Sequence, residues 1–254
     1  MNIESFNNKV ILITGAAGGF GTLLTEKLSR AGAKLVLGDR NTLGLELLIK
    51  NLGGEQPNII SQSCDVSKES EVAALVAAAV DNFGRLDIAI NNAGMSSVMK
   101  SLTDTTEADM DLNFAINTKG VFFGMKYQIQ QMLTQGEGII LNVASKAGIG
   151  GAPKLTAYSA AKHAVVGITK TAALEYARYN IRINAICPYF SPTPMVTDGV
   201  GINSDLLDML AKGSPMKRLG EPEEMVTAML MLIAPENSYL NGQAIAVDGG
   251  SSAF

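Results

Sequence analysis

The sequence is poor in the residues that build disulfides and metal centres. Its only two cysteines, Cys64 and Cys187, lie far apart, and it has a single histidine. A disulfide framework is therefore not expected, and the sequence predicts no metal site. Two unpaired thiols fit a reducing compartment, so we expect a cytoplasmic protein.

A long apolar run and a targeting segment are also missing. A membrane-spanning helix needs about 18 consecutive apolar residues, and the run Val72–Val80 is far shorter. The first ten residues are polar and contain Glu4, unlike the basic start and apolar stretch of a secretory signal. We therefore expect neither a membrane span nor secretion.

Excess positive charge is absent too. The chain has 20 Lys and Arg against 24 Asp and Glu, for a net charge of −4. Nucleic acids and anionic membranes attract basic surfaces, so neither is an expected partner. What the sequence does have is 47% hydrophobic residues over 254 positions, enough for one large core. We predict a single domain over 1–254 that acts on a small molecule.

Short β-branched runs alternate with longer helical patterns along the chain. The first six runs are separated by segments long enough for the crossover helices that parallel strands require. Continuous apolar runs such as Val10–Ile13 are typical of strands with helices on both faces. The sequence therefore predicts a doubly wound α/β fold, the Rossmann fold, with seven parallel strands. The predicted strands are Val10–Thr14, Leu35–Gly38, Ile59–Cys64, Leu86–Ile90, Gly138–Val143, Arg182–Ile186 and Ala244–Val247, and the predicted helices are Phe20–Ala31, Leu43–Asn51, Glu69–Phe83, Glu107–Thr134, Ala157–Tyr179 and Pro222–Ile233.

The region 188–221 breaks this alternation. It contains Pro188, Pro192 and Pro194 and only one short helical stretch, Ser204–Ala211. Long connections inside a compact domain are usually functional and often cover an active site. We predict a substrate-binding loop or lid here.

A glycine-rich turn follows the first predicted strand and leads directly into a helix. Glycines permit a tight turn and let backbone N–H groups approach a pyrophosphate, which the helix N-terminus attracts. The spacing differs from G-x-G-x-x-G, but the flanking strand and helix favour a dinucleotide site over an ordinary turn. The predicted cofactor contacts in this turn are Gly15, Gly18, Gly19, Phe20 and Gly21.

An acidic residue ends the second predicted strand. Asp39 lies 18 residues after Gly21, close to the spacing of about 20 expected for a ribose-binding acid. Its carboxylate would accept hydrogen bonds from the ribose hydroxyls and repel the 2′-phosphate of NADP. The neighbouring Arg40 could instead pair with that phosphate. The pattern favours NAD, with NADP as the alternative.

Tyr158 and Lys162 are the strongest candidates for chemistry. They are four residues apart in a helical pattern and so share one face. A phenol has an ordinary pKa of about 10, and a nearby ammonium would lower it, making the tyrosine an acid or base near neutral pH. Ser145 lies 13 residues before Tyr158, directly after a predicted strand. This places all three at the active-site end of a parallel sheet.

With these motifs in this order, the chain resembles the short-chain dehydrogenase/reductase family, in its single-domain branch. The resemblance implies an oxidoreductase that transfers a hydride between a nicotinamide cofactor and a secondary alcohol or ketone, and it implies a homotetramer. The segments that carry it are Thr14-Gly15-x-x-x-Gly19-x-Gly21, Asp65-Val66, Asn91-Asn92-Ala93-Gly94, Asn117, Ser145, Tyr158-x-x-x-Lys162, Arg218-Leu219-Gly220-Glu221-Pro222 and Asp248-Gly249-Gly250.

The resemblance also implies roles for individual residues. Tyr158 would transfer the proton, Lys162 would hold the nicotinamide ribose, and Ser145 would orient the substrate oxygen. Asn117 would hold a water that links Lys162 to solvent. The remaining implied cofactor contacts are Asp65 and Val66 at the adenine, Asn91, Ala93 and Gly94 along the cleft, and Pro188 and Thr193 after the sixth strand, with Thr193 at the carboxamide.

Tyr189 departs from the family pattern, which commonly has glycine after the proline at 188. Its ring would crowd the nicotinamide or form a wall of the substrate pocket. The candidate pocket residues include no arginine or lysine that could grip a carboxylate, so we predict a neutral, hydrophobic, cyclic or aromatic substrate. These residues are Met95, Ser96, Ala147, Ile149, Tyr189, Phe190, Met195 and Val196.

Three rival interpretations fit the sequence less well. Enoyl reductases share the fold but space tyrosine and lysine more widely than Tyr158 and Lys162. A nucleotide-sensing protein without chemistry would not need Asn117, Ser145, Tyr158 and Lys162 together. Sugar-nucleotide epimerases carry a larger C-terminal domain than the stretch after position 188. We therefore favour an enzyme.

Overall fold

Seven parallel strands form the centre of the computed structural model, which describes residues 3–197 and 204–253. Their order in the sheet is β3-β2-β1-β4-β5-β6-β7. The order reverses between β1 and β4, and ligands of such sheets bind beyond the carboxyl ends of the strands at this switch point. The strands are β1 (Val10–Thr14), β2 (Lys34–Asp39), β3 (Ile59–Ser63), β4 (Ile88–Asn91), β5 (Gly138–Val143), β6 (Ile181–Pro188) and β7 (Ala244–Val247).

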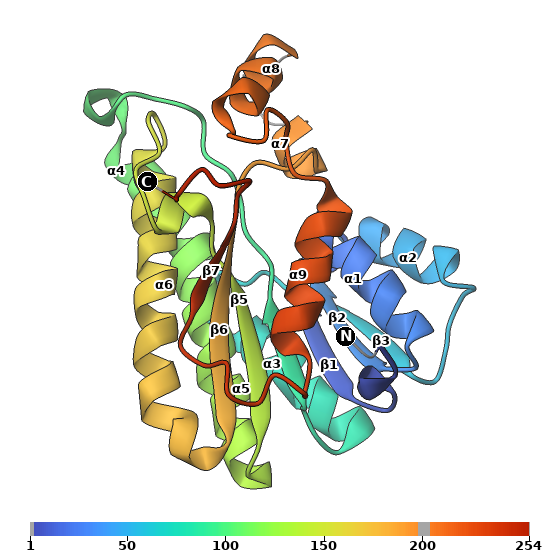
Figure 1. Cartoon of the computed structure of the whole chain (residues 1–254). Coiled ribbons are helices and arrows are strands. Elements are labelled where there is room, and N and C mark those ends of the chain that lie inside the picture. Colours follow the sequence, from blue (N-terminus) through green and yellow to red (C-terminus); the bar gives the residue numbers. More distant parts are fainter. Residues whose placement is uncertain (1–2, 198–203, 254) are drawn as a thin grey trace.

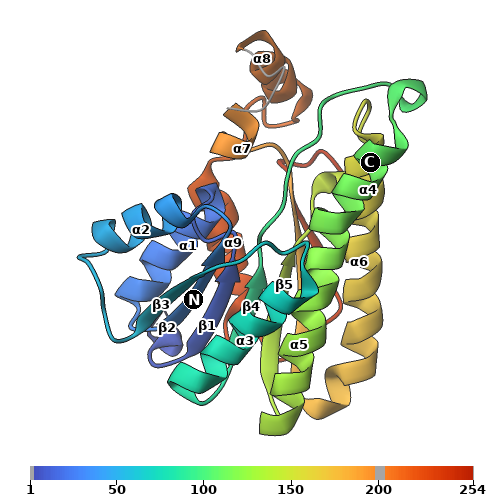
Figure 2. The same ribbon diagram turned by 180° about the vertical axis from the view of Figure 1, so that it is seen from behind.

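Helices cover both faces of the sheet (Figures 1 and 2). One face packs against α1 (Gly19–Arg30), α2 (Thr42–Asn51) and α9 (Pro222–Ile233). The other packs against α3 (Glu69–Phe83), α5 (Gly120–Gln135) and α6 (Thr156–Tyr176). Alternate strand residues enter the two cores: Ile13 lies with Leu24 of α1, whereas Leu12 lies with Leu75 of α3 and Val165 of α6. The predicted doubly wound parallel sheet is confirmed.

The predicted helix Glu107–Thr134 was wrong as a single α-helix. It consists of α4 (Glu107–Asn113), a π-helix (Phe114–Lys119) and α5. A π turn continues the helical path with one more residue per hydrogen-bonded turn, so the apolar pattern does not reveal the change. Such turns often mark functional sites, and this one contains Asn117.

Two short helices lie beyond the carboxyl ends of the strands, in the region predicted as a lid. They are α7 (Pro194–Thr197) and α8 (Ser204–Gly213), and α8 stands clear of the sheet (Figure 1). The stretch 198–203 of the predicted lid lies outside the described residues. Within the described ranges, no helix combines the length and apolarity needed to cross a bilayer.

Candidate active site

A cavity of about 620 Å³ opens beyond the carboxyl ends of the strands around the switch point. Residues that follow β1, β2, β4, β5 and β6 all line it, so one cavity joins the glycine turn to the Tyr158 region. This volume lies within the usual range for a ligand-binding cavity. The described part of the chain holds no cluster of three or more His, Cys, Asp or Glu suited to a metal ion.

Hydrogen bonds from the residues that follow β4 hold the glycine turn in its conformation. Gly15 has φ +65°, and a β-carbon at Gly21 would lie 2.1 Å from the Gly15 carbonyl oxygen, so both positions need glycine. The side-chain amide of Asn92 donates to the carbonyls of Thr14 at 3.0 Å and Gly15 at 2.9 Å. The Thr14 hydroxyl accepts from the N–H of Ala93 at 3.1 Å. The turn is thus preformed for close approach by a phosphate.

Gly18, Gly19 and Phe20 line the cavity at the start of α1. The N-cap residue Gly18 offers no side chain to the first turn of the helix. The free N–H groups and the positive end of the helix dipole therefore face the cavity, which is the arrangement that binds pyrophosphate. Gly21 lies behind this wall, where it permits the turn and does not itself line the cavity.

Asp39 is held at the cavity by two backbone donors. Its carboxylate accepts the N–H of Ala17 at 3.0 Å and the N–H of Asn41 at 2.9 Å. These bonds orient the carboxylate between the glycine turn and α2, where a ribose next to a pyrophosphate would lie. Arg40 also lines the cavity, but its side chain is exposed.

Asp65 and Val66 line the same end of the cavity. Ser67 donates to the Asp65 carboxylate from its hydroxyl at 2.7 Å and from its N–H at 3.0 Å. The hydrogen bond from the Ser67 hydroxyl is the main cause that lowers the pKa of Asp65. The carboxylate is therefore ionised and available as an acceptor for an adenine amine.

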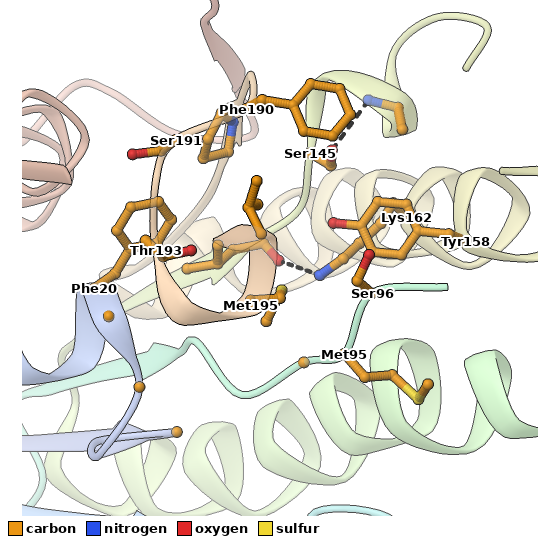
Figure 3. A pocket seen from close by; sticks show the side chains of 18 of the residues that line it. Phe20, Met95, Ser96, Ser145, Tyr158, Lys162, Phe190, Ser191, Thr193 and Met195 are labelled. Carbon is orange, nitrogen blue, oxygen red and sulfur yellow. Dashed lines mark hydrogen bonds between the residues drawn. The ribbon is translucent and has the colours of Figure 1, made fainter. Parts of the chain in front are cut away.

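Ser145, Tyr158 and Lys162 meet at the other end of the cavity (Figure 3). Tyr158 and Lys162 project from the first turns of α6, and Ser145 follows β5. The Lys162 ammonium lies 5.7 Å from the centre of the Tyr158 ring and donates to the carbonyl of Val143 at 2.8 Å. Burial lowers the pKa of Lys162 to about 8. The predicted grouping of these three side chains is therefore present.

The expectation that Lys162 lowers the pKa of Tyr158 was wrong for this structure. Burial raises the pKa of the phenol, and the neighbouring Ser145 hydroxyl offsets only part of this rise. The physical reason is that the Lys162 ammonium is directed at the Val143 carbonyl, while desolvation penalises the phenolate. The Tyr158 phenol is accordingly protonated at neutral pH.

Asn117 lies behind the cavity wall and does not line it. Its buried amide accepts the N–H of Met95 at 2.9 Å and donates to the Met95 carbonyl at 3.1 Å. It also donates to the side chain of Asn113 at 3.1 Å. The side chain thus fixes the segment after β4 that forms one wall of the cavity.

Two other predicted site residues are not at the cavity. Asn91 was predicted as a cofactor contact, but its buried side chain forms hydrogen bonds with Gln128 of α5 and Asn142 of β5. Its neighbours Ala93 and Gly94 do line the cavity. Ile149 was predicted as a pocket residue, but it packs against the core on the α6 side. Both lie within a few residues of true lining positions, a distinction that spacing alone does not make.

The remaining predicted pocket residues line the cavity, as do Pro188 and Thr193, and Thr193 lies against the glycine turn, where a β-carbon at Gly19 would be 2.7 Å from its side chain. The sequence reasoning missed several others, among them Lys146, which adds a cation to a pocket predicted to have none. The Lys146 ammonium donates to the Gly151 carbonyl at 3.2 Å. The lining residues not predicted include Asn41, Met99, Lys146 and Leu155, whereas Met209 and Leu210 belong to the predicted lid. Asn41 and Lys146 carried a positional signal, because they adjoin the predicted Arg40 and Ser145.

Known proteins share this architecture. A family model described as enoyl-(acyl carrier protein) reductase matches residues 15–252. Levodione reductase of Leifsonia aquatica is 37% identical over 255 residues, covering 98% of this chain and 96% of that protein. The chain belongs to the short-chain dehydrogenase/reductase family. As a short-chain dehydrogenase/reductase it is an oxidoreductase enzyme, and the predicted family is confirmed.

Other members of this short-chain dehydrogenase/reductase family cover the chain as fully. Cyclohexanol dehydrogenase of Acinetobacter sp. strain SE19 is 33% identical, covering 97% of this chain and 96% of that protein. A crystal structure of levodione reductase has a TM-score of 0.92 at 36% identity, over 98% of this chain and 99% of that chain.

Two further solved structures contain a nicotinamide cofactor. The 3-ketoacyl-(acyl-carrier-protein) reductase of Brucella melitensis with NADH has a TM-score of 0.89 at 33% identity, over 97% of this chain and 99% of that chain. ElxO with NADP has a TM-score of 0.91 at 30% identity, over 97% of this chain and 100% of that chain. These neighbours and the preformed glycine turn support a nicotinamide cofactor for this chain.

Proposed function

We propose that this enzyme interconverts a secondary alcohol and a ketone with NAD(H), and that its substrates are neutral, hydrophobic rings. The observation that carries the proposal is a single cavity with Asp39 and the glycine turn at one end and Ser145, Tyr158 and Lys162 at the other. A dinucleotide that spans this cavity would bring its nicotinamide to the Tyr158 end.

The chain's own residues supply the proton chemistry. In ketone reduction, Tyr158 would donate its phenolic proton to the carbonyl oxygen, and the raised pKa keeps that proton available. The Ser145 hydroxyl would bond the same oxygen as its charge develops. Lys162 would bind the ribose hydroxyls and, once turned toward Tyr158, stabilise the phenolate that remains. The bound nicotinamide supplies or accepts the hydride.

NAD is favoured over NADP by the way Asp39 is anchored. Its carboxylate is fixed by the N–H groups of Ala17 and Asn41 at the position expected for the ribose, so a 2′-phosphate would meet a negative charge. The Arg40 side chain is exposed, and solvent screens its charge, so it can offset only part of that repulsion.

A neutral ring is favoured by the walls around Tyr158. Met95, Met99, Phe190 and Met195 are apolar and adaptable in shape. The Lys146 ammonium donates to the Gly151 carbonyl, so a substrate carboxylate would have to compete with this bond. Levodione reductase and cyclohexanol dehydrogenase, two relatives, carry ring compounds in their names.

The proposal is tested by following the nicotinamide absorbance band with a panel of cyclic and aromatic ketones and alcohols. We expect turnover with NADH or NAD and several ring substrates, and lower turnover with open-chain keto acids. Binding of NADH without turnover of any panel member would favour the nucleotide-sensing alternative.

Replacing Asp39 with serine should narrow the preference for NAD. A charge-assisted hydrogen bond contributes about 1.5–3 kcal/mol, which is roughly a 10- to 100-fold preference in kcat/KM. The serine removes both this bond and the repulsion of the 2′-phosphate, and it leaves Arg40 to bind that phosphate. Equal or higher kcat/KM with NADPH in the unaltered enzyme would contradict the choice of NAD.

The enzyme should be a tetramer with two-fold axes. Large apolar side chains are exposed on the helices that the family resemblance assigns to subunit contacts: Phe122 of α5 is 50% exposed and Leu174 of α6 is 85% exposed. Light scattering at micromolar concentration should give four times the 26.7 kDa of the chain. A mass equal to the single chain would refute the assembly.

A further inference from the structure

Tyr189 occupies the position where the family pattern has glycine, directly after β6. Its main chain is anchored, because its N–H donates to the carbonyl of Val247 in β7 at 3.0 Å. Its ring packs edge-on against Phe190, with the ring centres 5.1 Å apart. Both rings line the cavity. The ring of Tyr189 therefore projects from a rigid strand end and has a fixed direction.

The phenol of Tyr189 reaches the lid helix α8. Its hydroxyl donates to the carbonyl of Leu210 at 3.3 Å, in the last turn of the helix. A β-carbon at Gly213, the final residue of α8, would lie 3.5 Å from the same phenol oxygen. Burial and the charge of Asp248 raise the pKa of Tyr189, so the phenol remains a donor at neutral pH.

Helix α8 is built to cover the cavity and has a polar outer side. Leu207 and Leu210 are partly buried, whereas Asp208 and Lys212 are exposed. Leu210 and its neighbour Met209 line the cavity. The helix stands beyond the strand ends, clear of the sheet (Figure 1), and the hydrogen bond from Tyr189 ties its last turn to the end of β6.

We propose that Tyr189 is a positioning and specificity-determining residue, which fastens α8 over the substrate end of the cavity through its hydroxyl while its ring forms part of the wall. This rests on the proposed function, in which that end holds the ring of the substrate. Tyr189 acts through Leu210 and Met209, which close over the substrate, and not on the reacting atoms.

Replacing Tyr189 with phenylalanine tests the hydrogen bond from Tyr189 to α8, because it removes the hydroxyl and keeps the ring. The amides of α8 should exchange hydrogen about two- to twelvefold faster, the factor expected for loss of one neutral hydrogen bond. KM for the ring ketone should rise by a similar factor, while kcat and the Kd of NADH stay at their original values. Tyr239→Phe is the matched control, since Tyr239 is fully exposed.

Tyr189→Gly restores the family residue and removes the ring as well. We expect this variant to lose affinity for small rings and to accept bulkier ketones. Unchanged exchange of α8 in Tyr189→Phe would overturn the proposal, and so would faster exchange without a rise in KM. Because hydrogen exchange needs no substrate, the contribution of the Tyr189 hydroxyl to the stability of α8 can be measured even if the unaltered enzyme turns over none of the ring compounds.

Discussion

Replacing Tyr158 with phenylalanine should reduce kcat by about 10²- to 10⁴-fold, the usual contribution of a positioned acid or base. Burial keeps the Tyr158 phenol protonated beside its hydroxyl partner, Ser145. Phenylalanine preserves the packing of the ring, so the fold and the Kd of NADH should not change. Steady-state kinetics and NADH fluorescence titration measure the two quantities.

Tyr176→Phe provides the control for Tyr158→Phe. Tyr176 is the last residue of α6, far from the cavity, and its ring lies 6.4 Å from that of Tyr179. This variant should keep full activity. If Tyr158→Phe retained a third of the original turnover, another group would have to supply the proton, and the proposed role of Tyr158 would be wrong.

Ketone reduction should slow as the pH rises through about 8. Burial lowers the pKa of Lys162 from its ordinary value of 10.5 to about 8, so the ammonium loses its proton above that pH. A neutral amine cannot stabilise the Tyr158 phenolate left after proton transfer. kcat/KM reports ionisations of the free enzyme, and its profile for reduction should therefore fall above pH 8. A flat profile to pH 10 would contradict this role.

Lys162→Met should lower kcat/KM at pH 7 by about 10²- to 10³-fold, as loss of a preorganised charge in an active site does.

Lys162→Met should also change the pH dependence of the free energy of unfolding. Because the folded-state pKa of Lys162 lies below the unfolded value, the buried ammonium destabilises the fold below pH 8, and this penalty disappears between about 8 and 10.5. The free energy of unfolding of the original enzyme should rise across that window relative to the variant, as urea titrations would show.

The sheet was predictable from the sequence because two features indicate its strands: a short apolar run and the helix that follows it. The run Val10–Ile13, for example, is apolar at every position and is followed by a helix of the right length. Strand ends shifted by only one or two residues, as at β6, which continues to Pro188. The break at Phe114–Lys119 was hidden, because a π turn continues the helical path and its residues give no local signal that separates it from an α-helix.

The site was predictable where a short motif fixes the geometry, as in the turn before α1 or the pair Tyr158 and Lys162 on α6. It was not predictable where neighbours in sequence diverge in space. Asn91 and Ala93 are two residues apart, yet one bonds beneath the sheet and the other lines the cavity. The direction of the Lys162 ammonium and the contact from Tyr189 to α8 depend on tertiary contacts that no local pattern encodes.

The π turn at Phe114–Lys119 makes this stretch intolerant of added residues. The turn already holds one residue more than an α-helical turn, and an α-helix turns by about 100° per residue, so one further inserted residue would rotate all of α5 relative to α4. The buried side of α5, with Val121, Met125 and Met132, would then swing away from β4 and β5. Homologous chains should therefore keep Asn117 and gain no residue at 114–119, and insertions should be confined to the loops around it.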